Sequence, residues 1–349
     1  MDLLRIVTAG SVDDGKSTLI GRLLFDSKAI DDDVLSAVED ASRRHRSDYV
    51  NLALLTDGLR AEREQGITID VAYRYFSTPL RKFILADTPG HVQYTRNMVT
   101  GASNAEVALI MVDARNGMVE QSRRHAVISS LLGINHIIVC INKMDLLNYS
   151  QEVYESIKTR FAALMTRLNV TNVEYIPTSA LNGDNVVERS NNMPWFTGEP
   201  LLKRLEELPV RGGLETLPLR FPVQNAITPS QHDYKVYAGS IASGVLHKGD
   251  RVCILPSGNE TIVSTIETPR CFVEQASAPD AVTVRLEDNI EISRGDMICS
   301  LYESPQISKT VDATVCWMDH QTAMHEGCVY RIKQGTNSTK AVVNRLEAR

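Results

Sequence analysis

Near the N-terminus the chain reads Gly10-Ser11-Val12-Asp13-Asp14-Gly15-Lys16-Ser17-Thr18, directly after the apolar run Leu3–Thr8. The spacing G-x-x-x-x-G-K-S between a strand and a helix is typical of a phosphate-binding loop, because backbone N–H groups of the loop and helix start point at phosphate oxygens. In such a loop Lys16 neutralises phosphate charge, and the Ser17 hydroxyl coordinates Mg²⁺. We therefore expect this stretch to bind a nucleoside triphosphate whose base the loop does not specify.

A second motif, Asp87-Thr88-Pro89-Gly90, follows the apolar run Lys82–Ala86. A carboxylate at this place can hold Mg²⁺ through water, and the glycine lets a backbone N–H approach the γ-phosphate closely. His91 comes next, where a histidine can orient the water that attacks the γ-phosphate. The alternative for a single histidine is a structural role, and its position beside Gly90 favours the catalytic one.

A third motif, Asn142-Lys143-Met144-Asp145, follows the apolar run His136–Ile141. The Asp145 carboxylate can accept hydrogen bonds from guanine N1–H and the 2-amino group, a donor pair that adenine lacks. After the next apolar run comes Ser179-Ala180-Leu181, which can contact the base through a main-chain N–H. Each short motif alone is compatible with an ordinary turn. Three in this order, each after its own strand, predict GTP binding.

Between the first two motifs lies Glu64-Gln65-Gly66-Ile67-Thr68-Ile69. The Thr68 hydroxyl can complete the Mg²⁺ shell only while γ-phosphate is present, so residues 56–70 are predicted to be an order–disorder switch. The predicted metal ligands are therefore Ser17, Thr68 and Asp87. The extra segment Ala29–Asp48 contains three aspartates, Asp31–Asp33, that can cap a helix, and apolar residues at 30–41 that fall on one face. It predicts an additional helix before this switch.

Short apolar runs alternate with amphipathic segments from residue 1 to about 208. The runs predict strands at Leu3–Thr8, Asp70–Phe76, Lys82–Ala86, Val107–Val112, His136–Ile141 and Val173–Pro177. Several runs are apolar at nearly every position, as in strands covered on both faces. Segments such as Gln121–Leu132 and Ser150–Leu168 predict helices between the strands. The alternation predicts an α/β P-loop GTPase domain with a mostly parallel sheet and helices on both faces.

The pattern changes near Pro209, where Arg211-Gly212-Gly213 has the composition of a linker. Short strands punctuated by glycines follow, and their spacing predicts an all-β barrel. The predicted strands are Arg220–Ala226, Lys235–Ile241, Asp250–Ile254, Thr261–Ile266, Ala281–Leu286 and Met297–Ser300. A second join near Pro305 precedes two or three further strands. The expected domains are residues 1–208, 215–304 and 305–349, the last being part of a second barrel.

Composition excludes several classes of protein. The 349 residues are 43% hydrophobic and 23% charged, as in ordinary globular chains. A net charge of −6 argues against a basic nucleic-acid binder, and no apolar run reaches the roughly 18 residues of a membrane helix. The six cysteines are far apart and form no C-x-x-C pair. We therefore expect free thiols in a cytoplasmic protein without a membrane partner.

Four stretches together resemble the translation-factor GTPases of the elongation factor Tu class. They are Gly10–Ser17, Gly66–Ile69, Asp87–His91 and Asn142–Asp145. The resemblance implies a β-barrel second domain after residue 215 and the start of a third domain after residue 305. Because related proteins carry a full third barrel there, it also implies that the chain of 349 residues is incomplete.

Longer stretches resemble, more specifically, the GTPase subunits of bacterial ATP sulfurylases. These stretches are 56–76, 87–103, 179–187, 192–195, 220–224 and 237–239. The resemblance covers residues 1–304 well and is looser beyond Pro305. Elongation factors usually carry His in place of Asp14 and Arg in place of Gln65, whereas the sulfurylase subunits share the residues found here. This difference puts tRNA delivery in doubt and leaves GTP hydrolysis untouched.

What this resemblance implies is a GTP-hydrolysing regulatory subunit of sulfate adenylyltransferase. Its partner would be a smaller catalytic subunit that forms adenosine 5′-phosphosulfate and pyrophosphate from ATP and sulfate, in a heterodimer or higher assembly. GTP hydrolysis, with GTP/GDP and Mg²⁺ as cofactors, would drive this uphill reaction. Some relatives carry a fused adenylyl-sulfate kinase. Two alternatives stay open: a carrier of aminoacyl-tRNA, and a GTP-dependent scaffold with negligible turnover.

Overall fold

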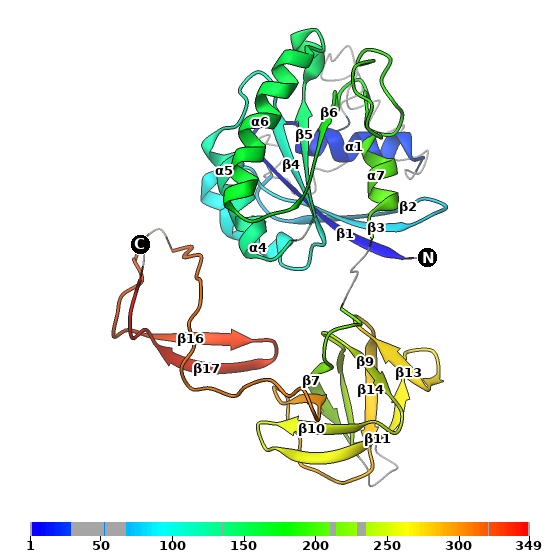
Figure 1. Cartoon of the computed structure of the whole chain (residues 1–349), viewed down its shortest axis with the longest axis vertical. Helices are drawn as coiled ribbons and strands as arrows, with labels where there is room; N and C mark the ends of the chain where they lie inside the picture. The colour runs from blue at the N-terminus through cyan, green and yellow to red at the C-terminus, as the bar shows by residue number, and fades with distance from the viewer. Residues whose placement is uncertain are drawn as a thin grey trace. The chain divides into compact units, whose positions relative to one another are not determined.

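The computed structural model of the chain describes residues 2–28, 52, 68–134, 136–209, 214–228, 235–319 and 321–347. It divides into two units, Met1–Val210 and Arg211–Arg349, whose elements are labelled in Figure 1. The predicted helix at 30–41 lies outside the described residues, as does the predicted switch at 56–70 except for its last three residues.

The first unit is built on a six-stranded sheet in the order β2-β3-β1-β4-β5-β6. Its strands are β1 (Leu3–Ala9), β2 (Ala72–Ser77), β3 (Lys82–Asp87), β4 (Val107–Asp113), β5 (His136–Asn142) and β6 (Asn172–Pro177). All neighbouring pairs are parallel except β2 with β3, which run antiparallel at the edge. This confirms the predicted mostly parallel sheet. Because parallel strands end on the same side, the residues after β1, β3, β4, β5 and β6 meet at one edge.

Helices cover both faces of this sheet, with α1 and α7 on one face and α4, α5 and α6 on the other (Figure 1). They are α1 (Lys16–Asp26), α4 (Thr95–Ala102), α5 (Glu120–Leu131), α6 (Gln151–Arg167) and α7 (Leu201–Glu207). Short 3₁₀ turns occur at η2 (Val92–Tyr94) and η3 (Met144–Leu147). All seven residues of β4 are buried, which explains why its sequence is apolar up to its last residue, Asp113. None of the described helices combines the length and apolar character needed to cross a membrane.

The second unit contains a closed antiparallel barrel with the strand order β10-β15-β7-β8-β14-β11-β12, and pairing of β10 with β11 completes the ring. The strands are β7 (Arg220–Ile227), β8 (Val236–Ser240), β10 (Arg251–Leu255), β11 (Asn259–Glu267), β12 (Phe272–Val273), β14 (Ala281–Leu286) and β15 (Met297–Ser300). Side chains alternate between core and surface, and Phe221, Tyr237 and Ile298 lie in the apolar core. This confirms the predicted barrel.

Two small sheets complete the second unit. One pairs β9 (Val245–His247) with β13 (Gln275–Ser277), and the other is a hairpin of β16 (Val329–Gln334) and β17 (Asn337–Val342). The Thr336 hydroxyl at the hairpin turn donates to the carbonyl of Val223, at 2.8 Å. Strands as short as β9, β12 and β13 have too few residues for a recognisable alternation, which is why the sequence did not predict them.

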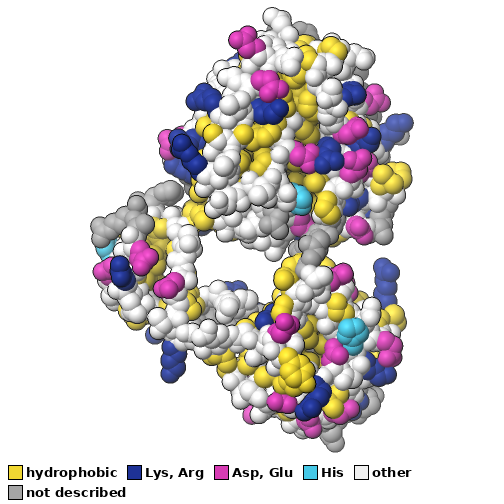
Figure 2. All heavy atoms as spheres, viewed as in Figure 1, with side chains coloured by type: hydrophobic (Ala, Val, Ile, Leu, Met, Phe, Trp, Pro, Cys, Tyr) yellow, Lys and Arg dark blue, Asp and Glu magenta, His cyan; other side chains and the backbone are white. Residues whose placement is uncertain are grey.

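Lysines and arginines are interspersed with aspartates and glutamates among the described residues on the face shown in Figure 2. The six cysteines form no disulfide, and three of them are buried. The predicted free thiols are therefore present in the structure.

Candidate nucleotide-binding site

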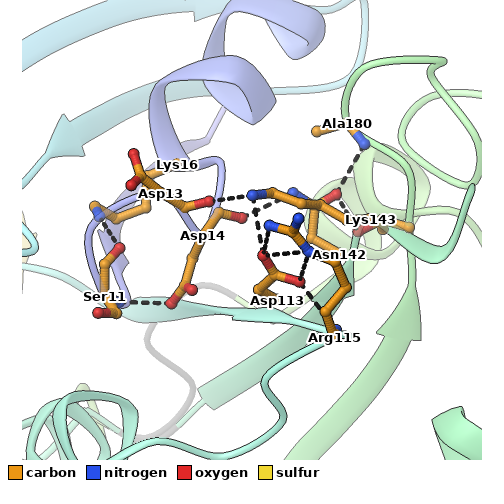
Figure 3. A network of polar contacts seen from close by, with 10 residues as sticks. Ser11, Asp13, Asp14, Lys16, Asp113, Arg115, Asn142, Lys143 and Ala180 are labelled. Carbon is orange, nitrogen blue, oxygen red and sulfur yellow. Dashed lines mark hydrogen bonds and ion pairs between the residues drawn. The ribbon is translucent and has the colours of Figure 1, made fainter. Parts of the chain in front are cut away.

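The predicted motifs come together at the carboxyl edge of the first sheet. Figure 3 shows residues of the phosphate loop, of the Asn142–Asp145 motif and of the 179–181 loop joined there by hydrogen bonds and ion pairs. The loop of residues 10–15 connects β1 to α1, and Gly15 precedes the helix in a left-handed conformation. Val12 and Asp13 form the turn of this loop, and Thr18 lies in the first turn of α1. The structure thus has the strand–loop–helix order that a phosphate-binding loop requires.

Lys16 folds back over this loop. Its Nζ donates to the carbonyl oxygens of Ser11 at 2.8 Å and Gly10 at 3.3 Å. The side chain is buried, and burial lowers the pKa of its ammonium group, an effect opposed by the carboxylate of Asp87. The ammonium group is therefore held at the loop, where it can neutralise phosphate charge.

Asp14 is unusual because it places a carboxylate inside an anion-binding loop. Its Oδ2 accepts the backbone N–H of Ser11 at 2.6 Å, and only 4% of the residue is exposed. Burial raises the pKa of this carboxyl group, which the Ser11 hydrogen bond and Lys16 partly offset. The carboxylate thus closes a turn within the loop and holds its shape.

Ser17 and Asp87 face each other. The Ser17 hydroxyl donates to Oδ2 of Asp87 at 3.0 Å, and the Thr8 hydroxyl donates to Oδ1 at 3.2 Å. The Thr88 hydroxyl donates to the carbonyl of Thr8, so the second motif is fixed to the end of β1. A hydroxyl and a carboxylate at this separation are the hard oxygen donors that Mg²⁺ prefers, and the pair fits the predicted metal site.

Gly90 lies against the phosphate-binding loop. A Cβ atom built on it would lie 2.5 Å from Nζ of Lys16 and 2.8 Å from the carbonyl oxygen of Gly10, so no side chain fits there. Pro89, which precedes it, is buried. His91 follows at the start of η2, where its Nδ1 accepts the backbone N–H of Gln93 at 3.3 Å. His91 therefore directly follows Gly90, the residue that lies against Lys16 and the phosphate loop.

Thr68 lies beside Ile69, whose carbonyl accepts a hydrogen bond from the Asn97 side chain at 2.8 Å. This bond joins the end of the predicted switch to α4. The assignment of Thr68 to the magnesium shell stays a prediction.

Asn142 joins the predicted guanine motif, Asn142–Asp145, to two neighbouring loops. Its Nδ2 donates to the carbonyl of Asp14 at 2.8 Å, and its Oδ1 accepts the backbone N–H of Ala180 at 2.9 Å. Met144 is fully buried and anchors η3, which carries Asp145. Ser179 is buried as well, whereas Leu181 is exposed. One side chain therefore sets the spacing between the phosphate loop, the Asn142–Asp145 motif and the 179–181 loop.

Asp113 and Arg115 are functional candidates that sequence reasoning missed. Oδ2 of Asp113 pairs with Nζ of Lys143 at 3.0 Å and with the Arg115 guanidinium at 2.6 Å, and Lys143 also donates to the carbonyl of Asp13. Burial alone would raise the pKa of Asp113, but the hydrogen bonds from Arg115 and Lys143 outweigh it and hold the pKa at about 2. Figure 3 shows this carboxylate joined to both Lys143 and Arg115. A charged residue ending the otherwise apolar β4 was the available signal.

His125 is a second residue that the sequence did not single out. Its Nδ1 accepts the backbone N–H of Gly10 at 2.9 Å, and its Nε2 lies 2.9 Å from the side-chain amide of Gln121, one turn earlier on α5. The ring is fully buried, and burial, with help from the charge of Lys16, lowers its pKa to about 3. The imidazole is therefore neutral, and its hydrogen bond to the N–H of Gly10 holds the first residue of the phosphate loop.

Comparison with known proteins places this site in a family. The family model described as the elongation factor Tu GTP binding domain matches residues 1–221. The chain is 53% identical over 350 residues to a protein of Mycobacterium tuberculosis named bifunctional enzyme CysN/CysC, covering 99% of this chain and 57% of that protein. It is 49% identical to sulfate adenylyltransferase subunit 1 of a Sulfurovum species, covering 99% of this chain and 74% of that protein.

A solved structure shares the fold at a greater distance. The GTPase-like domain of Saccharomyces cerevisiae Ski7, bound to GDP and inorganic phosphate, has a TM-score of 0.55 at 19% identity, covering 85% of this chain and 75% of that one. The chain thus spans about half the length of its bifunctional relatives and three quarters of the Sulfurovum subunit. On these matches the chain belongs to the sulfate adenylyltransferase subunit 1 family, within the proteins that carry an elongation factor Tu-type GTP-binding domain.

Proposed function

We propose that this chain is the GTP-hydrolysing regulatory subunit of a cytoplasmic sulfate adenylyltransferase. In this proposal GTP hydrolysis drives the formation of adenosine 5′-phosphosulfate and pyrophosphate from ATP and sulfate on a separate catalytic subunit. The observation that carries it is the site in which Asn142 joins the phosphate loop to the 179–181 loop, within a chain about half identical to named sulfate adenylyltransferase subunits.

Guanine recognition would depend on three groups that the fold brings to one place. Asn142 is held by the carbonyl of Asp14 and the N–H of Ala180, and Lys143 is held between Asp13 and Asp113. Asp145 lies two residues after Lys143 in η3 and would present its carboxylate to N1–H and the 2-amino group. Adenine would leave this carboxylate without its donor pair, and that loss supplies the selectivity.

For hydrolysis, the phosphate loop and Lys16 would bind the triphosphate while His91 orients the attacking water. Water adds to the γ-phosphorus as the bond to the β-phosphate oxygen breaks, giving GDP and inorganic phosphate. Ser17 and Asp87, with Thr68 as the third predicted ligand, would hold Mg²⁺. When bound, the ion neutralises charge on the β- and γ-phosphates.

Coupling to the partner would use the segments beside the γ-phosphate. Residues 68–70 are tied to α4 through Asn97, and His91 starts η2 directly before α4. Loss of the γ-phosphate would release these segments together, and a partner that contacts α4 or η2 would sense the change. Because one relative is named as bifunctional, a kinase protein or fused domain that acts on adenosine 5′-phosphosulfate belongs to the same proposal.

The test measures GTP hydrolysis by the full chain with the small catalytic subunit, ATP and sulfate, against parallel reactions with aminoacyl-tRNA. We expect stimulation only in the first mixture, with GTP consumed in proportion to the adenosine 5′-phosphosulfate formed. A mixture without sulfate is the matched control. Stimulation by aminoacyl-tRNA alone would favour the carrier function, and no hydrolysis in any mixture would favour a scaffold.

A further inference from the structure

Arg22 is a charged residue on α1 that takes no part in the motifs described so far. Its Nε donates to the carbonyl oxygen of Ala180 at 3.2 Å, and its Nη2 donates to the carbonyl oxygen of Leu181. The bonds therefore run from the helix that follows the phosphate loop to the loop that follows β6, 158 residues further along the chain. Two adjacent carbonyls held by one planar guanidinium leave this turn of backbone little freedom.

The direction of these bonds has a consequence for the opposite side of the loop. In a trans peptide the C=O and the N–H of one plane point in opposite directions. When Arg22 holds the carbonyl of Ala180, the N–H of Leu181 must point away from α1. The preceding N–H, that of Ala180, is already fixed by Oδ1 of Asn142 at 2.9 Å. Successive peptide groups of the predicted base-contacting loop are thus oriented by two side chains from different elements.

Neighbouring contacts hold the guanidinium in place before any ligand binds. Nη1 of Arg22 pairs with Asp26 one turn later at 3.3 Å, and the guanidinium carbon lies 5.7 Å from the ring centre of Phe25. The Arg22 side chain is 18% exposed. The loop approaches this pair closely at Gly183, where an added Cβ would lie 3.3 Å from Oδ2 of Asp26 and 3.5 Å from Cδ of Arg22.

The same helix carries the phosphate-binding residues. Lys16 and Ser17 form the start of α1, and Arg22 lies six residues beyond Lys16, a rise of about 9 Å along the helix axis. A movement of α1 that shifts Lys16 and Ser17 relative to the phosphates would therefore also move the carbonyls of Ala180 and Leu181. The helix forms a rigid connection between the phosphate end and the base end of the site.

We infer that Arg22 is a positioning residue for guanine recognition, because it orients the Leu181 N–H toward the exocyclic oxygen at position 6 of the base. This inference rests on the proposed role of residues 179–181 in the guanine site. Asp145 reads the N1–H and the 2-amino group, and Arg22 acts on the remaining edge of the base. The ligand class is a guanine nucleotide, and the group that is read is its carbonyl oxygen.

The test compares the binding of GDP and 6-thio-GDP to the wild-type chain and to Arg22→Ala. The thio analogue keeps N1–H and the 2-amino group but replaces the oxygen with sulfur, a weak acceptor. We expect the wild-type chain to prefer GDP and Arg22→Ala to bind GDP about tenfold more weakly. Its affinity for 6-thio-GDP should change less than twofold, so the preference largely disappears. A purely structural role for Arg22 would instead lower both affinities by the same factor.

Conservative variants separate the contributions of charge and geometry. Arg22→Lys keeps the charge but cannot hold two carbonyls in a fork, so its preference for GDP should lie between those of the wild type and Arg22→Ala. Asp26→Asn removes only the ion pair and should keep most of the preference. If Arg22→Ala fails to fold with saturating GDP, the lysine variant alone decides, and an unchanged preference in that variant would overturn the inference.

A failure of this inference can be told from a failure of the guanine site itself. Asp145→Asn should weaken GDP binding and favour xanthosine diphosphate, which presents an acceptor where guanine has a donor. If that exchange occurs while Arg22→Ala keeps its preference for GDP over 6-thio-GDP, Arg22 does not position the loop. If Asp145→Asn changes neither affinity, the proposed guanine site is itself wrong.

Discussion

Seventeen polar or charged side chains are buried in the described part of the first unit, whereas Thr261 is the one such side chain in the described part of the second. Burying a polar group without a partner costs about 1–3 kcal/mol, so a large buried set must be mutually bonded. In the first unit Thr8, Asp14, Asp87 and Asn142 are bonded in this way to their neighbours, whereas the buried hydroxyls of Ser122 and Ser129 on α5 have no such partner in the described structure. The first unit therefore holds polar groups in fixed positions in its interior, whereas the second has an ordinary apolar core.

The strands differ in the same way. Every residue of β4 is buried, and the one polar side chain in the strand, Asp113, lies at its carboxyl end. In β14, burial alternates along the strand, and polar side chains leave the barrel toward solvent. A typical surface pair is Arg251 with Glu260 at 3.3 Å, with side chains 64% and 50% exposed. Such exposed pairs contribute little to stability, so the barrel gains its stability from apolar packing.

The largest difference between the two units is expected when one histidine in each is replaced by alanine. His91→Ala should lower the rate of GTP hydrolysis about 10³-fold, because the attacking water loses the group that orients it, while GDP affinity stays within about twofold. His247→Ala in the barrel, where the ring is half exposed beside Asp250, is the matched control and should leave the rate unchanged. Single-turnover release of phosphate measures both. Equal rates for His91→Ala and the wild type would show that the histidine is structural.

A second change tests whether the barrel contributes only packing. Phe221 is fully buried in the barrel core, and Phe221→Ala should lower the free energy of unfolding of that unit by about 3–4 kcal/mol. Hydrogen–deuterium exchange should speed up in β7 and β14 and stay unchanged in β4 and β5. GDP affinity, measured on the same full-length preparation, should stay within about twofold. A loss of GDP affinity in Phe221→Ala would contradict the prediction that the barrel contributes only packing.

The sequence predicted the residues that form short motifs and missed those that support them from a distance. Lys16, Ser17 and Asn142 could be predicted because their motif spacing is local. His125 reaches Gly10 across 115 positions, and Arg22 reaches Ala180 across 158, so no spacing pattern connects either pair. Their importance depends on which strand ends meet, and that is set by sheet order.

A third prediction concerns pH and the buried imidazole of the first unit. The pKa of His125 is lowered to about 3 from an ordinary 6.5, so between these values the unfolded chain binds a proton that the folded chain does not. Stability should therefore fall as the pH is lowered through this window, by about 1.4 kcal/mol per pH unit once below the ordinary value. His125→Asn keeps an acceptor for the Gly10 N–H and removes the titration.

Unfolding of the first unit by urea at pH 7 and pH 5, followed with GDP at saturation, measures this effect. The wild type should lose about 2 kcal/mol more than His125→Asn over this range. The difference in unfolding free energy between the two proteins cancels the contribution of carboxylates that titrate in both. His247→Asn is the control, because this residue lies in the barrel unit and not in the unit whose unfolding is measured. Identical pH profiles for the wild type and His125→Asn would show that the ring is protonated in the folded chain.

The smallest effect is expected where a buried carboxylate acts through another side chain. Asp113→Asn keeps the shape of Asp113 but removes the charge that faces Lys143 at 3.0 Å and Arg115 at 2.6 Å. Lys143 then loses one of its two anchors while its bond to the Asp13 carbonyl remains, so GDP affinity should fall about tenfold, or ~1.4 kcal/mol. Asp250→Asn in the barrel removes a carboxylate that pairs with an exposed side chain and should change neither binding nor stability by more than about 0.5 kcal/mol. Calorimetric titration of GDP into both variants measures the contrast. If the two variants bind GDP equally well, the Asp113 carboxylate is no more coupled to the site than a surface charge, and the buried polar set of the first unit would then include members that the nucleotide does not use.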